Sequence, residues 1–203
     1  MTSDAAALPA PSSRQFTIAS LLWTMFTLSL VLGYLRQFGS TWLLVGTLVV
    51  IVCGAVSGAA QGLATGRPAI SAFWAVLIGV SGYLSVSGES REGLIFCIAW
   101  TAVGMLTGGA VGAVRSDQPY ARIAVGAVIA LATMGLIPLT VSRSFSATPM
   151  FDVLCAPVVG GLVGLLVTLV EQSERRYRIR RHMTTCWILS AVLIGNLMVQ
   201  VFV

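Results

Sequence analysis

The sequence predicts an all-α membrane protein, a helical bundle that crosses a bilayer about seven times. Of the 203 residues, 57% are hydrophobic and only 9% are charged, whereas a soluble domain has about 25% charged residues. The apolar residues also fall in uninterrupted runs close to the roughly 20 residues that a helix needs to cross a hydrocarbon core. Strands of a membrane barrel would alternate apolar and polar side chains. Continuous runs therefore favour helices, which satisfy their own backbone hydrogen bonds.

Seven apolar runs define the predicted spans, which together form one transmembrane domain over residues 16–203. The spans cover residues 16–35, 42–63, 69–86, 93–114, 123–141, 153–170 and 186–203. The third, sixth and seventh runs are the shortest. Residues 1–15 are polar and contain two prolines, so they are predicted to form a flexible tail. No small-x-small cleavage site follows the first run, which is therefore expected to remain as the first span.

Arginine positions predict how the chain is oriented. All twelve cationic residues are arginines. With seven spans, nine of them lie on one side and three on the other, and positive loops stay in the cytoplasm. The N-terminus is therefore predicted inside and the C-terminus outside. Most of the asymmetry comes from a predicted loop at residues 171–182, whose arginines are Arg175, Arg176, Arg178, Arg180 and Arg181.

Polar and aromatic residues near the run ends predict where the membrane surfaces lie. The aromatic residues expected at the two interfaces are Trp42, Trp74, Trp187, Tyr34, Tyr83 and Tyr120. No charged residue occupies the central part of a run; Asp152, Glu171, Arg115 and Arg122 all lie at run ends. Because ion and proton pathways usually need ionisable groups inside the membrane, this pattern disfavours ion-coupled transport.

The lead-in to the first span has a recognisable form. Residues 14–22 read Arg-Gln-Phe-Thr-Ile-Ala-Ser-Leu-Leu. This segment resembles the Arg-x-Phe-Ser/Thr-Ile/Leu lead-in of uncharacterised multi-span bacterial membrane proteins. The resemblance covers about a tenth of the chain and implies a location in the bacterial inner membrane. It implies no functional residues.

Three predicted spans contain small residues at every fourth position, which we call glycine ladders. Residues four apart share a helix face, and small residues there let two helices approach closely in a membrane. The strings CGAVSGAAQG, VGMLTGGAVG and CAPVVGGLVG recur at offsets of 50 and 52 residues, which predicts a threefold repeat of helical hairpins. Spans two, four and six are then expected to form the core. The ladder residues are Gly54, Gly58, Gly62, Gly104, Gly108, Gly112, Ala156, Gly160 and Gly164.

Two other interpretations of the glycine ladders stay open besides helix packing. Glycine is common in membrane spans, so the pattern could reflect composition alone. The ladder faces could also line a pore, although close helix packing is their usual role.

Two residue patterns are candidates for a catalytic or a metal site. Gly79-Val80-Ser81-Gly82 is similar to the GxSG motif of rhomboid-type intramembrane proteases, where a later histidine accepts the serine proton. The only histidine, His182, is predicted at the inner surface, whereas Ser81 is predicted in the outer half of its span. His182 and Cys186 have the spacing of metal ligands on a helix, but neighbouring arginines would repel a cation. No catalytic, cofactor or metal site is therefore predicted.

These observations lead to two functional hypotheses. The first is a non-enzymatic membrane scaffold or subunit that packs through its glycine ladders. Its five loop arginines would contact anionic lipid head groups, a protein partner or a second copy of the chain, and no nucleic acid. The second is a passive channel or substrate-binding membrane subunit for a small neutral solute.

Overall fold

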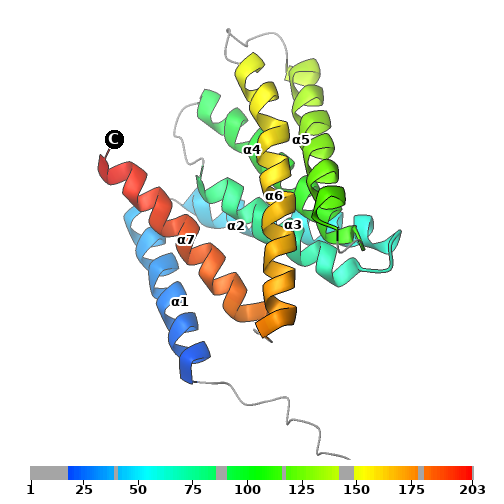
Figure 1. Cartoon of the computed structure of the whole chain (residues 1–203). Coiled ribbons are helices and arrows are strands. Elements are labelled where there is room, and N and C mark those ends of the chain that lie inside the picture. The colour runs from blue at the N-terminus through cyan, green and yellow to red at the C-terminus, as the bar shows by residue number, and fades with distance from the viewer. Residues whose placement is uncertain are drawn as a thin grey trace, which may run out of the picture.

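The described residues form seven α-helices and no strand, which confirms the predicted all-α class. The computed structural model describes residues 18–38, 41–85, 91–115, 118–141, 149–177 and 181–202, so the predicted tail at 1–15 lies outside them. The helices are shown in Figure 1. They are α1 Ile18–Phe38, α2 Thr41–Leu63, α3 Pro68–Ser85, α4 Arg91–Ala113, α5 Pro119–Val141, α6 Pro149–Tyr177 and α7 Arg181–Phe202.

Three of these helices are long and apolar enough to cross a membrane. The stretches are Leu43–Leu63 in α2, Pro119–Leu136 in α5 and Val153–Tyr177 in α6. Shorter apolar stretches lie in α1, α3 and α4, at Ser20–Tyr34, Pro68–Leu84 and Cys97–Ala113. The outer faces of α2 and α6 are lined with exposed aliphatic side chains such as Leu48, Val52, Leu162 and Leu169. These faces suit hydrocarbon as a solvent.

Several helices extend beyond the predicted apolar runs. The largest difference is at α6, where the predicted loop at residues 171–182 is wrong because the helix continues to Tyr177. Hydropathy detects only the apolar part of a helix, and the polar last turns remain helical. At the other ends, α3, α5 and α6 all begin at a proline, Pro68, Pro119 and Pro149. Proline favours the first helical position because no hydrogen-bond donor is lost there.

The interior of the bundle is formed by α3 and α4. α3 packs against α2, α4 and α7, and α4 packs against α2, α3, α5 and α6. Trp74 and Ala75 of α3 have no exposed surface. The expected core of spans two, four and six did not include α3, which the glycine ladders of α2 and α4 admit at close range.

All nine ladder residues are buried, and their glycines lie directly against neighbouring helices. A Cβ added at Gly58 of α2 would lie 2.7 Å from the Cα of Ala72, and one at Gly108 of α4 would lie 2.6 Å from the Trp74 carbonyl oxygen. Both neighbours belong to α3. In α6, Gly160 and Gly164 instead face the backbone of α5, at Gly126 and Arg122. The ladders of α4 and α6 therefore each pack on the preceding helix, and that of α2 on the following one.

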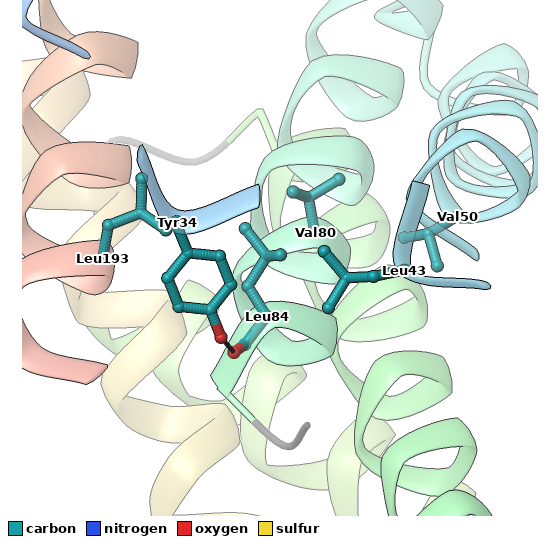
Figure 2. Close-up of a cluster of buried hydrophobic side chains, with 6 residues drawn as sticks. All are labelled: Tyr34, Leu43, Val50, Val80, Leu84 and Leu193. Atoms are coloured by element: carbon teal, nitrogen blue, oxygen red, sulfur yellow. Dashed lines mark hydrogen bonds between the residues drawn. The ribbon is translucent and has the colours of Figure 1, made fainter. Parts of the chain in front are cut away.

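The first and last helices form a pair at one side of the bundle (Figure 1). Thr27 of α1 bonds to Ser190 of α7 with 3.0 Å between the hydroxyl oxygens. At the far end of the pair, an apolar cluster joins α1 to α2, α3 and α7 (Figure 2). Its buried members are Tyr34, Leu43, Val50, Val80, Leu84 and Leu193. Figure 2 also shows the Tyr34 hydroxyl donating to the Leu84 carbonyl, at 3.2 Å.

Candidate functional site: a buried arginine–glutamate cluster

Charged side chains from separate parts of the chain meet where α2 and α4 end and α5 begins. We define the Arg–Glu cluster as Arg67, Trp74, Arg122 and Glu171. Arg67 follows α2, Trp74 lies in α3, Arg122 lies in the first turn of α5, and Glu171 lies in α6. The cluster therefore joins α3, α5, α6 and the α2–α3 turn at one end of the bundle.

The turn between α2 and α3 positions Arg67. Gly66 has a φ of 70°, a left-handed conformation that glycine adopts readily after a helix. The backbone N–H of Arg67 returns to the Gly62 carbonyl at 2.9 Å. Pro68 then starts α3, and a buried Ser71 hydroxyl donates to the Gly109 carbonyl of α4 at 2.6 Å. The turn thus directs the Arg67 side chain towards the end of α4.

Glu171 accepts hydrogen bonds from three side chains. Arg122 Nη2 lies 2.8 Å from Glu171 Oε2, and Arg67 Nη2 lies 3.5 Å from the same oxygen. The Trp74 indole N–H donates to Oε1 at 3.3 Å. Only 5% of Glu171 and 2% of Arg122 are exposed. Both carboxylate oxygens are therefore satisfied inside the protein, which a buried charge requires.

The two arginines of the cluster also bind the end of α4. Arg67 Nη1 and Arg122 Nη2 both donate to the Val114 carbonyl, at 2.8 Å and 3.2 Å. Val114 directly follows the last residue of α4, where helix carbonyls lack partners within the helix and have partial negative charge. Cationic donors at this position satisfy the carbonyl and stabilise the helix end.

The cluster contains more positive than negative charge. Two guanidinium groups face one carboxylate, and Nε of Arg122 is buried with no hydrogen-bond partner among the described residues. Arg115 adds a third cation. It is exposed, and its Nη2 lies 3.0 Å from where a Cβ would stand on Gly66. The α2–α3 turn and the end of α4 are therefore strongly cationic.

The cluster was not predicted from the sequence. Trp74, which was expected at a membrane interface, is completely buried among the helices, and so is nearly all of Tyr34. Glu171 and Arg122 were expected at run ends without a shared site. One signal in the sequence could have indicated the cluster: Arg67, Arg122 and Glu171 flank apolar runs on the same predicted side of the membrane. Which of them meet depends on helix packing, which run positions do not specify.

The five arginines predicted to contact lipid or a partner divide into three kinds. Arg175 and Arg176 are exposed in the last turn of α6, and Arg178 and Arg180 lie outside the described residues. Arg181 begins α7, pairs with Glu174 at 3.3 Å and stacks over the Phe73 ring at 5.5 Å. It therefore holds α7 against α6 and α3.

Ser81 and His182 have bonding partners other than each other. The Ser81 hydroxyl donates to the Leu77 carbonyl within α3 at 2.7 Å, and His182 bonds to the Ser20 hydroxyl of α1. Arg181, next to His182, lies over Phe73, which is about 12 Å along α3 from Ser81 at a rise of about 1.5 Å per residue. Within the described parts of the chain, no three metal-ligating side chains gather.

No protein-family model, curated protein or solved structure matches the chain.

Proposed function

We propose that the chain is a multi-pass protein of the bacterial inner membrane and that all seven helices cross the bilayer. The apolar outer faces of α2 and α6 support this proposal, as do the three helices of sufficient length. The packing of α3 against α2, and of α4 against α2, α5 and α6, also supports it, because helices packed against membrane helices share their environment.

The distribution of arginines supports a cytoplasmic N-terminus and an external C-terminus. Described arginines gather at the end where α2, α4 and α6 finish: Arg67, Arg115, Arg122, Arg175, Arg176 and Arg181. Arg36 and Arg91 lie at the ends of α1 and α4 that point the other way. By the positive-inside rule the arginine-rich end faces the cytoplasm.

We propose that the chain acts as a non-enzymatic scaffold or subunit. The observation that supports this role best is the Arg–Glu cluster, in which the ionic side chains bond to one another, to Trp74 and to a helix end. Such bonds fasten helices together. The bonds of Ser81 and His182 to other residues add support, because a serine nucleophile needs its base within about 3 Å. Arg175 and Arg176 would then contact anionic lipid, a partner protein or a second copy.

Native mass spectrometry in lipid nanodiscs tests this role. The full chain is tagged at its N-terminus and purified from the membrane. A second protein, or a second copy, at fixed stoichiometry is the expected result. A chain that arrives alone with a bound neutral small molecule would contradict the scaffold role.

A buried hydroxyl favours the alternative, a channel or binding subunit for a small neutral solute. Thr107 of α4 is completely buried, and its Oγ1 has no partner among the described residues. It lies between Val103 and Val111, which pack in two different clusters of the bundle interior. A solute oxygen or nitrogen bonded to Thr107 would satisfy this group.

The threefold hairpin repeat also remains a proposal. The shared four-residue spacing of the ladders in α2, α4 and α6 supports a repeat of these three helices. Their partners differ, because α2 and α4 both pack on α3 whereas α6 packs on α5. The ladder spacing therefore supports a repeat of the three ladder helices better than it supports a repeat of complete hairpins.

A further inference from the structure

We propose that the cationic surface beside Gly66, formed by Arg115 and by Arg67 of the Arg–Glu cluster, binds the phosphate of an anionic phospholipid. This inference rests on the proposed membrane location and adds a defined lipid site to it.

Positive charge exceeds negative charge beside the α2–α3 turn. Arg67 and Arg122 share one carboxylate, Glu171, and Arg115 lies over Gly66, the residue before Arg67. No described acidic side chain pairs with Arg115, and Glu171 is already bonded to Arg122 and Arg67. The excess of positive charge next to low-dielectric helices attracts an anion more strongly than the same charge in open solvent.

Arg67 and Arg122 have unused hydrogen-bonding capacity. A guanidinium has more N–H donors than these two residues use in their described bonds to Glu171 and Val114. Arg67 has 14% of its side chain exposed, so part of it reaches the surface, whereas Arg122 is buried. An oxygen-rich anion at the surface supplies acceptors for the unused donors of Arg67.

Both arginines of the site lie at helix ends. Arg67 lies just before α3, and Arg115 lies just after α4, where lipid head groups meet a membrane protein. Gly66 has no side chain, and the Arg115 guanidinium lies over it. Arg67 directly follows this glycine in the chain, and arginine binds phosphate through paired N–H donors.

Lipid retention in native mass spectrometry tests the site. The full chain is placed in nanodiscs of phosphatidylcholine containing a minor fraction of phosphatidylglycerol, and bound lipids are identified after release. Wild type is expected to retain phosphatidylglycerol in preference to phosphatidylcholine. Arg115→Gln is expected to lower its apparent affinity about fivefold, the effect of losing one arginine near a lipid surface.

Arg36→Gln is the matched control, because it removes one exposed arginine at the end of α1 that points away from the site. We expect it to reduce retention by less than about twofold. Gly66→Ala changes no charge but places a methyl group against Arg115, and it should also weaken retention. Equal losses for Arg115→Gln and Arg36→Gln would overturn the site, since they indicate that any exposed arginine contributes equally to retention.

Inorganic phosphate separates a lipid site from a free-anion site. We expect excess inorganic phosphate to leave phosphatidylglycerol bound. Displacement by inorganic phosphate would overturn the lipid assignment. A wild-type chain that enters nanodiscs but retains no phosphatidylglycerol would refute this site alone, whereas a chain that does not enter nanodiscs would refute the membrane proposal itself.

Discussion

At the scale of single residues, Glu171 contributes most to the stability of the Arg–Glu cluster, because it is the one carboxylate that faces Arg67, Arg122 and Trp74. Burial of its charge is tolerated only while these partners remain. Removing one member of a buried ion pair leaves the other charge uncompensated and costs about 3–5 kcal/mol.

We therefore predict that Glu171→Gln lowers the free energy of unfolding by about 3–5 kcal/mol. Thermal unfolding in detergent micelles, followed by helical circular dichroism, measures the loss. Glu174→Gln is the control, because Glu174 has one ion-pair partner, Arg181, and the side chains of the two are 11% and 40% exposed. A single pair with a solvated partner contributes about 1 kcal/mol. Equal stability of the two variants would mean that the Arg–Glu cluster does not fasten the helices.

Thr107 gives a second prediction at this scale. Thr107→Val removes a buried hydroxyl that has no described partner, so it should leave stability unchanged or raise it by up to about 1 kcal/mol. Thr168→Val is the comparison, since the Thr168 hydroxyl is buried and donates to the Gly164 carbonyl at 2.8 Å; it should lose about 0.5–1.5 kcal/mol. Marked destabilisation by Thr107→Val would indicate a bound molecule and favour the solute-binding alternative.

The contacts between individual residues of the site could not be predicted from the sequence. The charged positions themselves could be identified, and so could their location beside apolar runs. The partners of Glu171 could not, because they come from α2–α3, α3 and α5, which are distant in sequence. Trp74 is the clearest case: a tryptophan near a run end suits an interface equally well, and only the packing of α3 between α2 and α4 buries it.

At the scale of helices, close approach at the glycine ladders determines how the bundle packs. Gly108→Ala is predicted to destabilise the protein by about 1–3 kcal/mol, the usual cost of overpacking. The added Cβ would stand 2.6 Å from the Trp74 carbonyl oxygen, and a backbone atom cannot move away independently of its helix. Thermal unfolding in the same detergent gives the change.

Gly135→Ala in α5 is the control for this prediction, because nothing lies within 4 Å of a Cβ at Gly135. Alanine favours helix more than glycine by about 1 kcal/mol, so this variant should be neutral or slightly more stable. If both alanine variants behaved alike, the helices would not be in contact at Gly108.

Helices were predicted better than their ends or their neighbours. Each of the seven apolar runs corresponds to a helix, because continuous hydrophobicity is a strong signal. The end of α6 was missed since residues 171–177 are polar yet helical. The ladders were visible in the sequence, but the helix against which each one packs was not, because four-residue spacing defines a face and does not identify its partner.

At the scale of the whole molecule, the two ends of the bundle differ in chemistry. One end contains the Arg–Glu cluster and the exposed arginines of α6, and the other contains the apolar cluster around Tyr34 and Leu84. In the proposed seven-span arrangement, this difference defines the direction of the molecule in the membrane. It depends on α1 through α7 all crossing, because the omission of one span would reverse every helix that follows it.

The position of the C-terminus tests this account most directly. A reporter pair is fused after Val203, one member active only in the cytoplasm and the other only outside it. With seven crossings and a cytoplasmic N-terminus, we predict activity of the external reporter alone. Activity of the cytoplasmic reporter alone would contradict seven spans and require an even number of crossings.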